Sequence, residues 1–189
     1  VRRDEGRSVI AGYPWFLDWG RDSLIFVRGM IAAGLYEEAE AVLRTFGRLE
    51  KDGTLPNAIF GGNETNRETS DAPLWFALAC EELTKRGGRD ILGCPLDDTG
   101  RTFLDILISI ASHYIHGTPN GIRVDKRSGL VFCPAHFTWN DTNHPAATPR
   151  EGYPVEMQAL WIRLLHQLAG LEATTGSGED FSEWHTKAR

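Results

Sequence analysis

The chain lacks the features that mark membrane-spanning, secreted and disulfide-bonded proteins. Its 189 residues contain no run of about 18 apolar residues, so no transmembrane helix is predicted. No apolar signal region follows the charged start Val1-Arg-Arg-Asp-Glu-Gly-Arg7, and we expect an intracellular, cytoplasmic protein with no membrane partner. The three cysteines are odd in number and far apart, which argues against a disulfide framework and predicts reduced thiols at Cys80, Cys94 and Cys133.

Basic tracts and metal-ligand motifs are also missing. The formal net charge is −6 and no basic stretch alternates with aromatic residues, so no nucleic-acid partner is expected. The six histidines show no HExxH or other ligand spacing, which argues against a metal, and no GxSxG nucleophile motif is present. The composition is otherwise that of an ordinary globular chain with one core.

What the chain does contain is a dense run of aromatic and charged residues. Between Trp15 and Asp22 lie two tryptophans, two aspartates and one arginine. An indole stacks on the C–H face of a sugar ring, while Arg donates to and Asp accepts from the sugar's hydroxyls. The run therefore predicts a site for a polar ligand with flat apolar faces, such as a sugar.

Hydrophobic spacing predicts helix pairs joined alternately by short turns and by long loops. The clearest helix spans 36–50, where Ala39, Val42, Leu43, Phe46 and Leu49 follow an i, i+3, i+4 pattern. Other helices are predicted at 23–35, 71–85, 102–116 and 154–174, with one more beginning at Phe181. Residues 51–70 read as a long loop, and 122–132 as a small, irregular β-hairpin. The natural fold is an all-α toroid of helical hairpins.

A second loop, from Pro134 to Tyr153, brings a tryptophan close to an aspartate. An aspartate held against an indole can have its ionised form disfavoured by desolvation, which suits Asp141, beside Trp139, to protonating a glycosidic oxygen. The alternative is that Asp141 only caps a turn, because Asn-Asp-Thr-Asn is ordinary turn chemistry.

The other polar candidates also have structural interpretations. Asp18, Arg21 and Asp22 could hold one another as an ion-pair cluster at a helix start. The remaining candidates could serve as loop and cap residues (Asn57, Asn63, Asn66 and Asp71), as a solvent ion pair (Arg150 and Glu151), or as a complement to a helix dipole (Glu156). Trp75, Phe76 and Trp161 fall within apolar helical periods and are expected in the core.

Five motifs occur together in a recognisable order. They are the stretches 10–23, Gly53-Thr-Leu-Pro-Asn57, Thr69-Ser-Asp-Ala-Pro-Leu-Trp-Phe76, Phe137-Thr-Trp-Asn-Asp141 and 148–161. In this order they resemble the C-terminal domain of glycogen debranching enzymes, the amylo-α-1,6-glucosidase family, over nearly all of residues 8–170. The resemblance implies a glucoamylase-like (α/α)6 toroid with its active site in the mouth of the ring.

The resemblance also implies roles for individual residues. Asp141 matches the aspartate of the family's Thr-Trp-Met-Asp motif and would be the general acid, although Asn140 replaces the methionine. Asp18, Arg21 and Asp22 would hold the terminal glucose, with Trp15, Asn57, Asp71, Trp139, Arg150 and Glu156 lining the site. The implied reaction is inverting hydrolysis of α-1,6-linked glucose from glycogen, limit dextrin or a branched maltooligosaccharide, with no cofactor.

The family's general base is a glutamate well downstream of the acid. We therefore expect residues 1–189 to be a partial glycoside hydrolase domain, about half of the toroid, belonging to a longer polypeptide and inactive alone. One alternative is a non-catalytic glucan-binding half-domain. Another is a different toroid hydrolase, of the glucoamylase or trehalase type.

Overall fold

The structure is a computed structural model that describes residues 2–3, 6–60, 63–142 and 148–175. The helix predicted to begin at Phe181 lies outside these residues. Helices within them are α1 (Gly20–Ala32), α2 (Tyr36–Arg48), α3 (Ala72–Gly87), α4 (Phe103–His116) and α5 (Val155–Thr175). The strands are β1 (Arg2–Arg3), β2 (Gly6–Arg7), β3 (Asp18–Trp19), β4 (Ala58–Phe60), β5 (Asn63–Glu64), β6 (Arg123–Val124) and β7 (Val131–Phe132).

The predicted helices at 36–50, 71–85, 102–116 and 154–174 are confirmed to within a few residues. α2 buries Ala39, Val42, Leu43 and Phe46, as its spacing predicts. α4 begins with a capping box, in which the Thr102 hydroxyl accepts from the Asp105 N–H at 3.2 Å and Asp105 accepts from the Thr102 N–H at 2.7 Å. Gly88, at φ 66°, ends α3 in the left-handed conformation that glycine adopts without strain.

The first helix departs from the prediction. α1 begins at Gly20 rather than Ser23, which puts Arg21 and Asp22 in its first turn. Its buried positions include Leu24, Val27 and Ile31, whereas Ile25 is exposed. Residue 20 itself lies against another segment, because a Cβ there would be 2.8 Å from the Pro56 carbonyl oxygen. Only glycine lets the two segments approach so closely.

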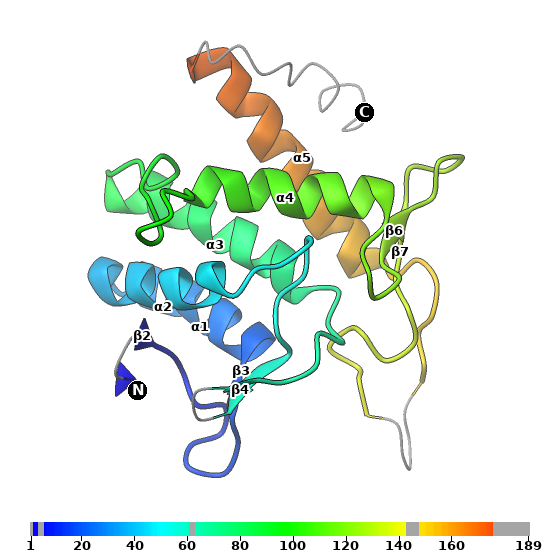
Figure 1. Cartoon of the computed structure of the whole chain (residues 1–189), viewed down its shortest axis with the longest axis horizontal. Coiled ribbons are helices and arrows are strands. Elements are labelled where there is room, and N and C mark those ends of the chain that lie inside the picture. Colours follow the sequence, from blue (N-terminus) through cyan, green and yellow to red (C-terminus); the bar gives the residue numbers. More distant parts are fainter. Residues whose placement is uncertain (1, 4–5, 61–62, 143–147, 176–189) are drawn as a thin grey trace.

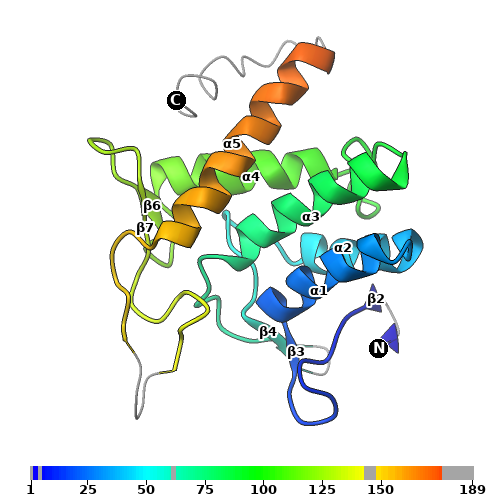
Figure 2. The ribbon, with the colours of Figure 1, turned by 180° about the vertical axis from the view of Figure 1, so that it is seen from behind.

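Odd-numbered helices pack side by side and point the same way. α1 contacts α3, and α3 contacts α5, while α2 contacts α1 and α3. Figures 1 and 2 show the amino ends of α1, α3 and α5 turned toward the side of the molecule that carries the yellow loop before α5. The first residues of three helices therefore share one side with the second predicted ligand loop.

The fold is helix-rich but is not purely helical. Residues 51–70, predicted as a loop, contain β4 and β5, which form an antiparallel sheet with β3 in the order β3-β4-β5. Asp18 pairs with Ile59 in this sheet. β6 and β7 form the predicted small hairpin. β3, β4 and β5 were not predicted, because two or three residues are too few to show an alternating pattern. These described elements are compatible with a partial helical fold.

The core runs between the helices and contains stacked aromatic rings. The ring centroids of Phe76 in α3 and Phe103 in α4 lie 6.2 Å apart, and those of Tyr114 in α4 and Trp161 in α5 lie 5.9 Å apart. As predicted, Phe76 and Trp161 are buried and Trp75 is partly buried. Among the described residues, no helix is both long and apolar enough to cross a membrane.

Candidate active site

One buried arginine joins two aspartates that lie far apart in the sequence. Nε of Arg21 donates to Oδ2 of Asp71 at 2.7 Å, and Nη1 donates to Oδ2 of Asp141 at 2.9 Å. Arg21 comes from the first turn of α1, Asp71 from the residue before α3, and Asp141 from the loop before α5. Arg21 thus contacts both of these predicted site aspartates, and we name the three residues the Arg21 cluster.

Asp71 supports the cluster instead of capping its own helix. It occupies the N-cap position of α3, as predicted, yet its side chain makes no cap hydrogen bond. One carboxylate oxygen accepts from Arg21, and the other accepts from the Thr69 hydroxyl at 3.1 Å. A side-chain N-cap hydrogen bond typically contributes about 1 kcal/mol to stability, and the Asp71 side chain does not make it. The sequence signal for a cap was therefore correct in position and wrong in the bonding of the side chain.

Arg21 is almost fully buried and incompletely paired. Burial acts to lower the pKa of its guanidinium, but the charge of Asp71 and hydrogen bonds to Asp71 and Asp141 outweigh this effect and raise it. Its third nitrogen, Nη2, is buried and has no hydrogen-bond partner among the described residues. Oδ1 of Asn57 is in the same condition. Because buried polar atoms are usually paired, these two atoms are exceptions among the described residues.

Asn57 is tied to the start of α1 through its backbone. Its carbonyl accepts from the Gly20 N–H at 2.9 Å, and its own N–H donates to the Asn66 carbonyl at 2.7 Å. The glycine at position 20 permits this approach. The strand pairing of β3 with β4 therefore brings Asn57 next to the residue that precedes Arg21.

The loop that carries Asp141 is attached to its surroundings at several points. Cys133 and Gly152 exchange backbone hydrogen bonds of 2.7 and 3.0 Å, and His136 N–H donates to the Pro149 carbonyl at 2.8 Å. The Phe137 carbonyl accepts from the Ser70 N–H at 2.6 Å, just before α3. The Asp141 side chain remains 33% exposed, so it faces both Arg21 and solvent.

Trp139, Arg150 and Glu156 form a second group. The indole Nε1 donates to Oε1 of Glu156 at 3.1 Å, and Arg150 pairs with Glu156 through both terminal nitrogens. The hydrogen bond from Arg150 lowers the pKa of Glu156. Arg150 therefore pairs with Glu156 and not, as one alternative held, with Glu151 in solvent.

Three further predicted residues occupy the same stretch as Arg21. Trp15 is 82% exposed in the loop before β3, and Asp22 is exposed on α1. Asp18 is buried in β3 and accepts from the Ser8 hydroxyl. Arg21 forms its ion pairs with Asp71 and Asp141. It is therefore not paired as in the alternative that joined it to Asp18 and Asp22.

Sequence reasoning missed Ser8 and Thr69, the two hydroxyls that orient predicted site aspartates. Thr69 lies two residues before Asp71 and carries the Thr-x-Asp spacing of local side-chain hydrogen bonding. Ser8 lies ten residues before Asp18 and is brought close only by the path of the chain, so no local signal could have identified it.

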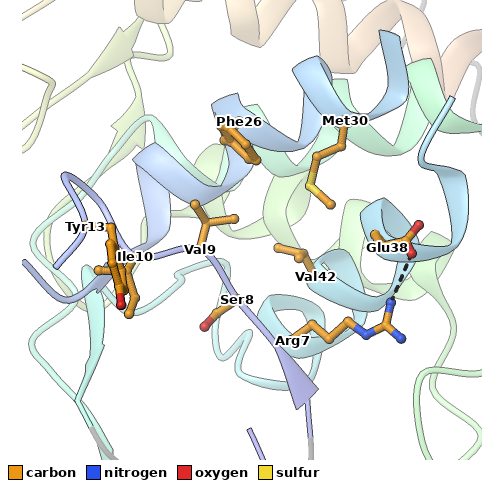
Figure 3. A pocket seen from close by; sticks show the side chains of 9 residues that line it. All are labelled: Arg7, Ser8, Val9, Ile10, Tyr13, Phe26, Met30, Glu38 and Val42. Carbon is orange, nitrogen blue, oxygen red and sulfur yellow. Dashed lines mark ion pairs between the residues drawn. The ribbon is translucent and has the colours of Figure 1, made fainter. Parts of the chain in front are cut away.

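A hollow of about 470 Å³ lies beside this region and is lined mainly by apolar side chains. Figure 3 shows it between the N-terminal segment and helices α1 and α2, with Tyr13 and Phe26 at one end and the ion pair of Arg7 and Glu38 at the other. Its lining includes Ser8 but no member of the Arg21 cluster. The chemistry-bearing residues are therefore outside this hollow.

The arrangement combines a carboxyl that reaches solvent, a buried cation with an unpaired donor, and an exposed indole. Such a set can bind hydroxyl groups, stack a sugar ring and exchange a proton. Within residues 2–3, 6–60, 63–142 and 148–175, no group of three or more His, Cys, Asp or Glu side chains could hold a metal ion.

Comparison with known proteins gives a consistent result. The model of a protein family described as amylo-alpha-1,6-glucosidase matches residues 1–189. A glycogen debranching enzyme of Saccharomyces cerevisiae (strain ATCC 204508 / S288c) is 29% identical to the chain over 136 aligned residues. That match covers 58% of this chain and 9% of the yeast protein, so the chain spans a small part of that relative's length.

Proposed function

Since this chain belongs to the amylo-alpha-1,6-glucosidase family, we propose that its Arg21 cluster binds the terminal glucose of an α-1,6-linked branch and that Asp141 protonates the bond to be cut. The substrate class is the branched α-glucan, such as glycogen or limit dextrin. The observation that carries the proposal is the convergence of Arg21, Asp71 and Asp141 from three separate elements.

The unpaired polar atoms support a hydroxyl-rich ligand. Nη2 of Arg21 is a buried donor and Oδ1 of Asn57 is a buried acceptor, and neither is satisfied by the described residues. Leaving such atoms unpaired costs about 1–3 kcal/mol each. A sugar hydroxyl both donates and accepts, so its hydrogen-bonding capacity matches either atom. Asp18, Asp22 and Trp15 would complete the grip on that unit.

Asp141 has to carry a proton when the glycosidic bond breaks. In the structure its Oδ2 accepts from Nη1 of Arg21 at 2.9 Å, so this hydrogen bond has to be released before that oxygen can serve the glycosidic bond. We propose that the bound sugar takes over the hydrogen bond of Arg21 Nη1 and leaves the Asp141 carboxyl free to donate a proton to the glycosidic oxygen. Asp71 keeps its own bond to Arg21 and holds the guanidinium in place meanwhile.

The proposed reaction is hydrolysis with inversion at the anomeric carbon. It requires a second carboxylate that activates water from the opposite face of the sugar, about 6.5–9.5 Å from the acid. In the family this base is a glutamate downstream of the acid, so residues 1–189 alone are expected to release no glucose. We propose that α1 to α5 are part of an (α/α)6 ring, which is supported by the shared direction of α1, α3 and α5.

The test is glucose release by the full-length protein from an oligosaccharide with a single α-1,6-linked glucose stub. The proposal predicts β-glucose as first product, and loss of at least about a hundredfold in kcat for Asp141→Asn, with little change in substrate affinity. Asp98→Asn, an exposed aspartate in the turn before α4, is the matched control and should retain full activity. Binding without release would favour the glucan-binding alternative, and faster release from linear than from branched oligosaccharides would favour a glucoamylase-type enzyme.

A further inference from the structure

The indole of Trp139 is held by two charged side chains near the start of α5. Its Nε1 donates to Oε1 of Glu156 at 3.1 Å. The guanidinium of Arg150 lies over the ring, with Cζ 5.6 Å from the ring centroid, and also donates to Glu156. Each of the three side chains therefore contacts the other two.

The carboxylate of Glu156 is already nearly saturated by these contacts. Oε1 accepts from Trp139 and from Arg150, and Oε2 accepts from the other terminal nitrogen of Arg150 at 2.8 Å. A carboxylate offers about four lone-pair sites, so three are used within the group. Glu156 could bind a sugar hydroxyl as a principal partner only by giving up one of these bonds.

Trp139, in contrast, keeps a large open surface. The residue is 63% exposed although its N–H is bonded and Arg150 lies over its ring. An aromatic ring with a fixed edge and an open side is a suitable stacking partner for the apolar face of a sugar. Its rotamer is restricted before any ligand arrives, which reduces the entropy lost on binding.

The position of Trp139 in the chain connects it to Asp141. The Phe137 carbonyl is bonded to the Ser70 N–H, Trp139 is bonded to Glu156, and Asp141 is bonded to Arg21. These alternate residues anchor the loop to the starts of α3, α5 and α1. The Trp139 contact is the middle anchor of the segment that presents Asp141.

We propose that Arg150 and Glu156 are positioning residues, which fix Trp139 as a rigid stacking platform for a sugar ring beside Asp141 and do not bind the sugar themselves. This role differs from the substrate contact that the family resemblance implied for both residues. The identity of the ligand rests on the proposed function, whereas the hold on the indole does not.

The first test is a double-mutant cycle on binding in the full-length protein. The dissociation constant for the stub oligosaccharide is measured by calorimetry for Trp139→Ala, Glu156→Ala and the double variant, all carrying Asp141→Asn to prevent turnover. If Glu156 acts only through Trp139, each single change weakens binding by about three- to tenfold and the double variant is no weaker than Trp139→Ala. If instead the fold-losses in affinity of the two single variants multiply in the double variant, Glu156 contacts the sugar directly and the inference is overturned.

Matched variants separate positioning from a general loss of charge. Glu156→Gln retains an acceptor for the Trp139 N–H and should recover much of the binding lost in Glu156→Ala. Glu151→Ala removes a nearby exposed carboxylate and should leave binding unchanged. Equal losses in Glu156→Gln and Glu156→Ala would show that the negative charge itself is what the sugar requires, against the proposal.

The second test needs no glucan and therefore distinguishes this inference from the proposed function. The Trp139 indole N–H is observed by nitrogen-15 NMR, with its resonance identified by its loss in Trp139→Phe. In Glu156→Ala the resonance should shift and its hydrogen exchange should speed up, while Glu151→Ala should change neither. An unaltered resonance would disprove the hold on the indole. An altered resonance in a protein that neither binds nor cuts glucan would uphold the hold and reject the ligand assignment.

Discussion

The two aspartates bonded to Arg21 are expected to contribute very differently to stability. Asp71 is 2% exposed and pairs with a guanidinium that is itself buried, so removing its charge leaves a buried cation with only one partly exposed partner. Breaking a buried ion pair from one side costs about 3–5 kcal/mol. Because Asp141 still pairs with Arg21, we expect the lower end, about 3 kcal/mol, for Asp71→Asn.

For Asp141→Asn the expected loss is much smaller. Its side chain is 33% exposed, and Arg21 keeps its 2.7 Å bond to Asp71. Partly exposed pairs contribute at most about 1 kcal/mol. The decrease in Tm should therefore be about three times larger for Asp71→Asn than for Asp141→Asn.

The assay is urea unfolding of the full-length variants, followed by tryptophan fluorescence and checked by calorimetry. Asp98→Asn serves as the control for the loss of one surface carboxylate. Equal destabilisation by Asp71→Asn and Asp141→Asn would refute the reasoning, because it would mean that Arg21 depends on both carboxylates as structural partners. Asp141 would then not be available to leave the ion pair during catalysis.

Further predictions follow from other buried and charged groups. Glu50, whose side chain is fully buried, accepts from Gly53 N–H, Ser109 and Arg101, so Glu50→Ala should cost about 3 kcal/mol in urea unfolding, and a loss below about 1 kcal/mol would contradict this hub role. Burial raises the pKa of Cys133 to about 12, and Cys80 is fully buried, so iodoacetamide at neutral pH should label Cys94 first among the three thiols, as read by mass spectrometry. The folded pKa of Glu156 is lowered, so the stabilisation from its pair with Arg150 is present above the ordinary glutamate value of about 4.3 and is lost as the pH falls through the folded value. The indole resonance of Trp139 should therefore shift at a pH below that ordinary value, and a midpoint above it would contradict the sign.

Most of the helical part of the fold could be predicted from the sequence because its signals are local. The spacing in α2, the Thr102 and Asp105 capping pair of α4, and the Gly87-Gly88 stop of α3 all act within one or two turns. The start of α1 could not be predicted in this way. Its first residue, Gly20, lies close to the Pro56 carbonyl, a contact between residues 36 apart in the sequence that no local pattern indicates.

The candidate site also combines features that the sequence predicts with features that depend on packing between elements. The residue types of the loops predicted a sugar-like ligand, and the structure joins Arg21 to Asp71 and Asp141 by hydrogen bonds. The pairings within the set could not be read from spacing. Asp71 resembles a simple helix cap and Arg150 stands next to Glu151, yet their charged partners are Arg21 and Glu156, which are selected by packing between elements.

The most direct test of the central claim is a crystal structure of the full-length Asp141→Asn protein with the stub oligosaccharide bound. The account predicts a terminal glucose with one hydroxyl within about 3 Å of Arg21 Nη2 and its glycosidic oxygen against the side chain at position 141. A sugar bound elsewhere, with Arg21 still holding both neighbouring side chains and Nη2 unpaired, would contradict it.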